Sequence, residues 1–381
     1  MSITQYISER GLSLRETLDR VLKLYSSRKC MGYRDPKTRK YQWLTYREVR
    51  ERAVSIKRAI ESRVEVKNFN IGLCGRNDPS WILNDFASCL IEGSIVVGIH
   101  SHWQARTLER ILTETEVNVL LIERESCKHV LSNLSKKCQD QLRLIVATDN
   151  YSTPSQNTSL PSGVISMNEL LSLSVARETE RTQQFLLRPY TYLYTSGSSG
   201  RPKGLAISRK QWLSNARISL PCGACDDPCV MSHMSLAHGG DRGLAWQSVF
   251  HGVRVGFSNI DLFQDARELR PTFILCMSEM YITLHANYNR KIVSWFEQTY
   301  PRLTKELSPT KDLPPEHLRR LAHHFAEKLD TKTGSSISLT FRKEIRDSLG
   351  GRLFNIVTGG GKIEKETMLF LDRTFFGNTS L

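Results

Sequence analysis

The sequence has 381 residues, of which 40% are hydrophobic and 24% are charged, and its formal net charge is +14. This composition excludes a disordered chain, and the longest apolar stretch, residues 94–99, is too short to cross a membrane as a helix. Nine cysteines at irregular spacing favour a reducing compartment, and no apolar signal-peptide segment follows Met1, so a cytoplasmic location is expected.

The positive charge predicts attraction to polyanions such as nucleotides, phosphate-rich cofactors and anionic lipid headgroups. The densest basic stretch, residues 28–58, is interleaved with aromatic and apolar residues, which favours a solvated helix face over a membrane or nucleic-acid patch. No zinc-finger, helix-turn-helix or RNA-binding signature accompanies the charge, so no nucleic-acid partner is expected. Peripheral contact with an anionic membrane is a further expectation from the charge alone.

Strand and helix signals alternate along the first half of the chain. Residues 69–75 are typical of a buried strand, and Asp78 with Pro79 supplies an N-cap and a first-turn proline for the next helix. Later elements are expected as strand 95–99, helix 105–115, strand 117–122, helix 126–138, strand 142–147 and a loop over 150–165. Strands that alternate with helices in this way pair in parallel, with both faces of the sheet covered.

The alternation resumes after this loop. Strands are expected at 190–195, 205–208, 230–236, 253–258, 272–277 and 352–358, with a helix at 209–220. A long, more polar helical insertion is expected near 278–349. The pattern predicts an α/β protein with two sheets, divided into a first subdomain of residues 1–188 and a second of residues 189–381.

The segment Tyr194–Gly204 has the composition of a loop that binds phosphate. Its glycines permit a tight turn close to an anion, and the nearby lysine adds a positive charge. The residues concerned are the hydroxyl donors Thr195, Ser196, Ser198 and Ser199, the glycines Gly197 and Gly200, and Lys203. It is not a Walker A loop, because Pro202 stands where the second glycine belongs. It is not a dinucleotide-binding fingerprint either, because it leads into a strand rather than directly into a helix. A plain hairpin turn is the alternative.

This segment resembles the phosphate-binding signature of the adenylate-forming superfamily, which includes acyl-CoA synthetases, luciferases and adenylation domains. Further segments resemble the long-chain acyl-CoA synthetases, a branch similar to the adenylation domains of carboxylic acid reductases. These segments are residues 43–48, 79–82, 234–242 (with Ser235 where proline is usual), 270–277, 349–353 and 358–361. In the last of them Gly361 and Lys362 stand where the family usually has Ala-Pro.

The resemblance implies two doubly wound, mostly parallel sheets of an acyl-activating N-terminal domain. It implies that the loop hydroxyls and Lys203 bind the β- and γ-phosphates of ATP, while the glycine loop Gly359, Gly360 and Gly361 helps to form the adenine and acyl site. His238 would be the catalytic residue that orients the carboxylate; a buried histidine at a helix start is the alternative. The implied substrates are a carboxylic acid, most simply a fatty acid, with ATP, CoA and Mg²⁺.

The family's Gly-Tyr-Gly-x-Thr-Glu block, which holds phosphate and Mg²⁺, would follow Leu381, as would its mobile C-terminal domain. We therefore expect this chain to be a partial or inactive copy, whether a fragment, an incomplete gene model or a degenerate relative. Two other functions stay open at this stage: the adenylation domain of a carboxylic acid reductase, and a non-catalytic nucleotide- or acyl-binding relic.

Two histidine and cysteine patterns are interpreted as structural. Cys222, Cys225 and Cys229 with His233 could hold Zn²⁺, but cysteines that enter a buried strand more often serve as small apolar residues, so no metal site is expected. His100 and His102 follow a strand with no acidic or cysteine cluster nearby, and are expected to be satisfied polar residues.

Overall fold

The computed structural model describes residues 12–64, 70–100, 102–153, 159–172, 188–195, 201–218, 220, 225–258, 261–307, 315–333 and 337–376. The chain forms two compact units, residues 1–262 and 263–381. This division differs from the subdomain boundary expected at residue 188, because the two strands that follow that position pair into the sheet that precedes it.

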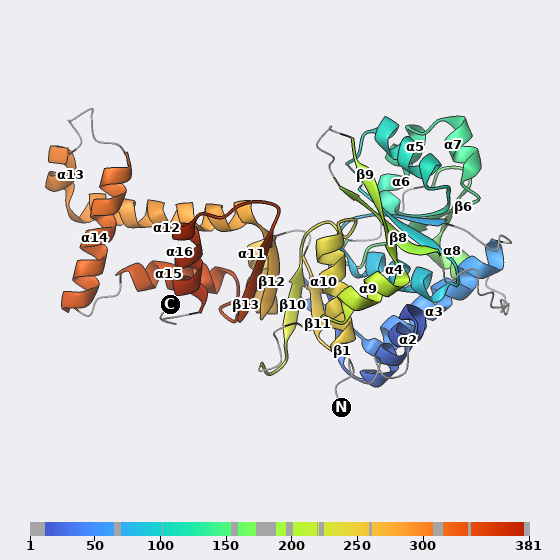
Figure 1. Cartoon of the computed structure of the whole chain (residues 1–381), viewed down its shortest axis with the longest axis horizontal. Coiled ribbons are helices and arrows are strands. Elements are labelled where there is room, and N and C mark those ends of the chain that lie inside the picture. The colour runs from blue at the N-terminus through green and yellow to red at the C-terminus, as the bar shows by residue number, and fades with distance from the viewer. Residues whose placement is uncertain are drawn as a thin grey trace. The chain divides into compact units, whose positions relative to one another are not determined.

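A seven-stranded sheet dominates the first unit (Figure 1), in the order β7-β6-β5-β3-β4-β8-β9. All neighbours run parallel except β8 and β9, which are antiparallel. The strands are β3 (Asn70–Cys74), β4 (Ile95–Ile99), β5 (Val117–Glu123), β6 (Leu144–Thr148), β7 (Val164–Ser166), β8 (Pro189–Thr195) and β9 (Lys203–Ser208). The parallel pairing follows from the helices that return the chain between successive strands.

Two separate apolar cores lie on the two faces of this sheet. One contains side chains of α5 (Ala105–Glu114), α6 (Arg124–Ser132) and α7 (Lys136–Gln141). The other contains side chains of α2 (Leu14–Leu24), α3 (Tyr46–Arg63), α4 (Pro79–Leu90), α8 (Met167–Ser172), α9 (Arg209–Ala216) and α10 (Gly239–Phe250). The sheet is therefore covered on both faces, as the alternating pattern predicts.

Further strands of the first unit pair as β10-β11-β1-β2, with β10, β11 and β1 parallel and β2 antiparallel to β1. Their bounds are β1 (Lys29–Arg34), β2 (Tyr41–Thr45), β10 (Cys229–Ser232) and β11 (Arg254–Phe257). The basic stretch 28–58 thus forms a strand pair followed by α3. The predicted α/β class with mostly parallel sheets is confirmed.

The second unit is largely helical around the parallel strand pair β12 (Phe273–Met277) and β13 (Asn355–Gly359). Its helices are α11 (Leu262–Leu269), α12 (Ser278–Thr299), α13 (Pro301–Leu307), α14 (Pro315–Thr333), α15 (Ile337–Ser348) and α16 (Lys365–Phe375). Helix α12 packs against α14, α15 and α16. In the part of the chain that the structure describes, no helix combines the length and apolar character needed to cross a membrane.

Local signals explain why some helices begin where the sequence predicts and others do not. Asp78 caps α4 through a bond from Ser80 N (3.0 Å), with Pro79 in the first turn. The single helix expected at 126–138 is wrong, because Ser135 restarts the chain as a second N-cap and separates α6 from α7. The loop expected at 150–165 also ends earlier, since β7 begins at Val164.

Candidate active site

His238 lies at the start of α10, as the residue before its first turn, and its side chain makes no capping hydrogen bond. Its surface is exposed, so the alternative of a buried helix-start histidine does not describe it. The segment before it turns because His238 N donates to Ser235 O at 3.0 Å. The imidazole is therefore presented at a helix N-terminus, where the backbone N–H groups favour an anionic ligand.

His100 brings a second imidazole against the first. The ring centroids of His100 and His238 are 4.5 Å apart, and those of His100 and His102 are 5.2 Å apart. His100 is only 4% exposed, and its Nδ1 lies 3.1 Å from Ser235 Oγ. The serine that replaces the family's usual proline thus hydrogen-bonds the histidine at the end of β4.

The three histidines perturb one another electrically. Burial, followed by repulsion from His238 and His102, lowers the pKa of His100 to about 4. Partial loss of solvent around the ring, followed by repulsion from His102, also lowers the pKa of His238. At neutral pH both rings are therefore uncharged, and each can donate one hydrogen bond and accept another. A neutral imidazole can orient a carboxylate without becoming a strong ion pair with it.

An aromatic bridge connects these histidines to the end of β8. The Trp103 ring lies 4.8 Å from His100 and 5.8 Å from Tyr194, measured between centroids. Tyr194 also donates from its hydroxyl to Glu114 Oε1 at 2.6 Å, which ties β8 to α5. The end of β8 is thus fixed immediately before Thr195, where the proposed phosphate loop begins.

The described ends of that loop face each other across the β8–β9 pair. Thr195 is the register partner of Lys203, and Tyr194 is that of Gly204. Both Thr195 and Lys203 are exposed, so a hydroxyl and an ammonium group stand side by side at one end of the hairpin. The other loop residues predicted to bind phosphate, Ser196, Gly197, Ser198, Ser199 and Gly200, lie outside the described residues, and their roles stay predictions.

Two glycines allow the His238 segment to lie this close to the sheet. A Cβ added at Gly98 would stand 3.0 Å from the Cα of Ala237, and one added at Gly239 would stand 2.8 Å from Leu193 Cδ1. Such distances leave no room for a methyl group without movement of the backbone or of Leu193. Gly98 belongs to β4 and Leu193 to β8, so His238 is held over two adjacent parallel strands.

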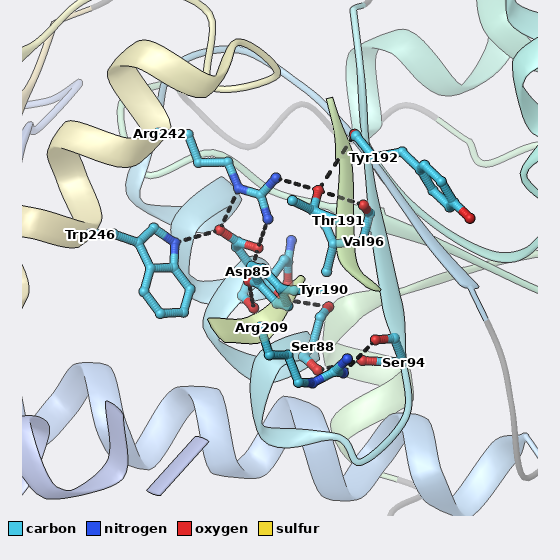
Figure 2. Close-up of polar contacts among 11 residues, drawn as sticks. Asp85, Ser88, Ser94, Val96, Tyr190, Thr191, Tyr192, Arg209, Arg242 and Trp246 are labelled. Carbon is cyan, nitrogen blue, oxygen red and sulfur yellow. Dashed lines mark hydrogen bonds and ion pairs between the residues drawn. The ribbon is translucent and has the colours of Figure 1, made fainter. Parts of the chain in front are cut away.

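A buried ion pair between Arg242 and Asp85 anchors the part of α10 that follows His238 (Figure 2). Arg242 donates to both oxygens of Asp85 (2.8 and 2.6 Å) and to Thr191 Oγ1 (2.8 Å). Asp85 also accepts from Trp246 Nε1 (2.7 Å) and from the Tyr190 hydroxyl (2.6 Å). These bonds join α4, α10 and β8, which fixes the start of α10 relative to the strand that leads into Thr195.

A second buried carboxylate, that of Asp241, holds the preceding turn. Its Oδ2 accepts from Asn77 Nδ2 (3.1 Å), Ser232 Oγ (2.8 Å) and Met234 N (2.9 Å). Burial raises the pKa of Asp241 to about 7, although these hydrogen bonds oppose the shift. The carboxyl group therefore sits in a less favourable electrostatic setting than Asp85, which is paired with a guanidinium.

The glycine loop Gly359, Gly360 and Gly361 closes β13 in the second unit. Gly360 has φ +87°, and a Cβ there would fall 2.1 Å from Met277 Cε; at Gly361 it would fall 2.6 Å from Ser278 Oγ. Only glycine fits this backbone so close to the end of β12. The packing explains the glycines structurally, and their contribution to an adenine or acyl site stays a prediction.

Metal ligands are not assigned. Among the described residues, no group of three or more His, Cys, Asp or Glu could hold a metal ion. Cys222, one member of the weighed zinc pattern, lies outside those residues.

The sequence predicted His238 but not its surroundings. The prediction that His100 is a satisfied polar residue agrees with its burial and its contact with Ser235 Oγ. The sequence did not predict its place beside His238, together with His102 and Trp103. The usable signal was their position at the carboxyl end of a parallel strand, where ligands of α/β sheets commonly bind.

Comparison with known proteins gives a consistent result. The family described as "AMP-binding enzyme" matches residues 19–380. Fatty acyl-CoA synthetase A of Dictyostelium discoideum is 26% identical over 350 residues, which are 90% of this chain and 50% of that protein. The chain spans about half the length of the curated relatives it matches.

Solved structures share the fold. The adenylation domain of a carboxylate reductase from Mycobacterium chelonae has a TM-score of 0.73 at 15% identity, covering 98% of this chain and 58% of that one. The corresponding domain from Segniliparus rugosus, solved with AMP and a co-purified carboxylic acid, has a TM-score of 0.70 at 18% identity, covering 98% and 60%.

Proposed function

We propose, since the chain belongs to the AMP-binding enzyme family, that it serves the ATP-dependent activation of a carboxylic acid, with fatty acids as the substrate class. In this reaction a carboxylate oxygen attacks the α-phosphorus of ATP. The new bond gives an acyl-adenylate, and the bond between the α- and β-phosphates breaks to release pyrophosphate. A thiol, proposed to be that of CoA, then attacks the acyl carbon and displaces AMP.

The observation that carries this proposal is the pairing of Thr195 with Lys203 at the end of the β8–β9 hairpin, beside the histidine and aromatic group. A lysine at the end of a glycine- and hydroxyl-rich loop suits the outer phosphates, where negative charge gathers as pyrophosphate leaves. Attack on phosphorus needs positioning and charge neutralisation more than covalent help from the protein.

His238 is proposed to orient the carboxylate. It is exposed at the start of α10, and its lowered pKa keeps the ring neutral at pH 7. One ring N–H can then hold one carboxylate oxygen and leave the other free to attack. The named relatives are acyl-CoA synthetases, which supports CoA over a carrier-protein thiol as the acceptor.

Contact with membranes is a separate part of the proposal. A net charge of +14 would draw the protein to anionic lipid surfaces, where fatty acids accumulate. Co-sedimentation with anionic and with neutral vesicles at low and high salt measures it. Binding that ignores lipid charge and salt would count against this part alone.

The nucleotide assignment is tested by titrating ATP and AMP into the wild-type chain and into Lys203→Ala. Losing one charge-assisted contact to an outer phosphate should cost about 1.5–3 kcal/mol in ATP affinity and little in AMP affinity. Lys210→Ala, an exposed lysine of α9, is the matched control and should change neither. Equal weakening of both nucleotides would remove Lys203 from this role.

Catalysis is tested by ATP–pyrophosphate exchange with a panel of fatty acids. Exchange that requires an added acid, and that falls in His238→Ala, supports the proposed reaction. Nucleotide binding without exchange would instead favour the non-catalytic alternative.

A further inference from the structure

A pocket of about 350 Å³ lies within the second unit, lined by residues of α12, α14, α15 and α16. This volume is at the lower end of the range typical of small-molecule sites, about 300–1,000 Å³. Its walls are unusually rich in basic and aromatic groups. They include His285, Tyr288, Asn289, Arg319, Arg320, His323, His324, Glu327, Arg342, Glu366, Phe370 and Arg373.

Positive charge exceeds negative charge around this pocket. Four arginines line it against two glutamates, Glu327 and Glu366. Arg319 Nη2 lies 3.5 Å from Glu366 Oε2, and Glu316 Oε1 lies 3.6 Å from Arg319 Nη2 and 3.5 Å from Arg320 Nη2. These ion pairs are long and both glutamates are more than half exposed, so they neutralise little charge. Among the described residues, Arg342 Nε is buried without a hydrogen-bond partner. Burying such a donor is unfavourable unless something else satisfies it.

The Tyr288 hydroxyl is a second unpartnered group in the same wall. Tyr288 is 3% exposed, and within the described part of the chain its hydroxyl has no hydrogen-bond partner. Its ring is held by Phe370 at 4.9 Å and by His323 at 5.5 Å, between centroids, and the Arg342 guanidinium lies 5.6 Å from its centre. Two buried polar groups from different helices, Arg342 Nε and the Tyr288 hydroxyl, are thus placed in one wall of the pocket.

The histidines of the pocket are held in fixed orientations. His285 Nδ1 lies 2.8 Å from Thr367 Oγ1, and its ring is stacked on Phe370. His323 Nε2 lies 2.9 Å from Asn289 Oδ1. Each ring therefore uses one nitrogen for the protein and keeps the other for a ligand or solvent.

We propose that this pocket binds a multiply phosphorylated small molecule or headgroup. Arginines match the paired oxygens of phosphate groups better than any other side chain. A ligand with several phosphates would place acceptors against the arginines and give Tyr288 its missing partner. The aromatic wall of Tyr288 and Phe370 suits the carbon body that carries these phosphates. The site lies in a different compact unit from the β8–β9 hairpin, and it does not depend on the proposed function.

The test is calorimetric titration of the whole chain with myo-inositol 1,4,5-trisphosphate. Arg342→Gln should weaken binding by about tenfold to a hundredfold, the loss expected for one charged hydrogen-bonding contact. Arg346→Gln, an exposed arginine of the same helix that does not line the pocket, should bind as the wild type does. Tyr288→Phe keeps the aromatic packing and should also weaken binding, because only the hydroxyl is lost.

A second arm identifies the source of the phosphates. Phosphatidylcholine vesicles with 5% phosphatidylinositol 4,5-bisphosphate are compared with pure phosphatidylcholine vesicles by co-sedimentation. Vesicle binding that Arg342→Gln abolishes indicates a lipid headgroup, whereas binding of the soluble trisphosphate alone indicates a free phosphate ester. The proposal is overturned if neither probe binds, or if binding survives in Arg342→Gln and disappears in Lys203→Ala, since the phosphate would then lie on the hairpin loop.

Discussion

Two arginines, one in each unit, show what a guanidinium does when all of it is buried and partnered and when a single buried nitrogen lacks a partner. Arg242 has no exposed side-chain surface, and it meets both oxygens of Asp85 and the hydroxyl of Thr191. Arg342 contributes a buried Nε with no partner among the described residues, beside an equally unpartnered Tyr288 hydroxyl.

The difference separates structural charge from charge available to a ligand. The Asp85 carboxylate accepts hydrogen bonds from Arg242, Trp246 and Tyr190, so the network stabilises one packing of α4, α10 and β8. Around Tyr288 and Arg342 two buried polar atoms meet no hydrogen-bond partner among the described residues, so an arginine there is available for recognition. The hydrogen-bond partners of a buried polar group therefore distinguish a structural role from a ligand-binding role, which burial alone does not do.

The largest difference in stability between the two sites is expected when each arginine is replaced by methionine. Arg242→Met should lower the free energy of unfolding by about 3–5 kcal/mol, because it leaves Asp85 as a buried carboxylate without its counter-ion. Arg342→Met should cost about 1 kcal/mol or less, since it removes a cation–π contact and no ion pair. Urea denaturation of both variants measures the difference.

The double variant Asp85→Leu with Arg242→Met serves as the control. Removing both charges should recover much of the stability lost in Arg242→Met. Equal losses in the Arg242 and Arg342 single variants would contradict the distinction drawn here.

Asp241 provides a second comparison, with Asp85. The buried carboxylate of Asp241 accepts hydrogen bonds from neutral donors, whereas that of Asp85 is paired with Arg242. The pKa of Asp241 is about 7 in the folded state against 3.8 in the unfolded state, so only the unfolded chain ionises readily between these values. Stability attributable to Asp241 therefore falls as pH rises from about 4 to 7, by roughly 4 kcal/mol in total.

Asp241→Asn should remove this slope, and the variant should gain on the wild type as pH increases. Chemical denaturation across this pH range, taken as the difference between the two proteins, measures it. That difference cancels the opposite slope from His100 and His238, whose lowered pKa values make stability rise with pH. A pH-independent difference would show that Asp241 ionises normally.

The smallest effect is expected at Tyr288. Tyr288→Phe removes a buried hydroxyl with no partner, so the unliganded protein should keep its stability or gain up to about 1 kcal/mol. Tyr281→Phe, on the same helix, removes a hydroxyl that donates to Val357 O at 3.3 Å and should cost about 0.5–1.5 kcal/mol. Thermal unfolding compares them, and a clear loss in Tyr288→Phe would mean that its hydroxyl is already satisfied.

Local patterns were sufficient for much of the fold and for one part of the candidate site. The alternation of strands and helices predicted the parallel sheet, and Tyr194–Gly204 predicted a hairpin loop between two strands, as β8 and β9 show. Asp78 and Pro79 predicted the start of α4. Each of these signals is contained in a few consecutive residues.

Long-range partners were not predictable in this way. Asp85 and Arg242 are 157 positions apart, and Ser235 is 135 positions from His100. The residues next to one member of such a pair do not indicate the other member, because the two meet only once the strand order is set. The break between α6 and α7 was missed for a different reason: the local signal was present, since Ser135 caps a second helix, but it was interpreted as part of one continuous helix.

The close approach of Gly98 to Ala237 sets the distance between the sheet and His238. Because Gly98 of β4 has no side chain, the segment before α10 can pack directly against the strand. A Cβ at position 98 would lie 3.0 Å from the Cα of Ala237. The position of the His238 imidazole therefore depends on Gly98, a residue that has no functional group of its own. Gly98→Ala is expected to move His238 by a fraction of an ångström, because the added methyl group would meet the main chain of Ala237.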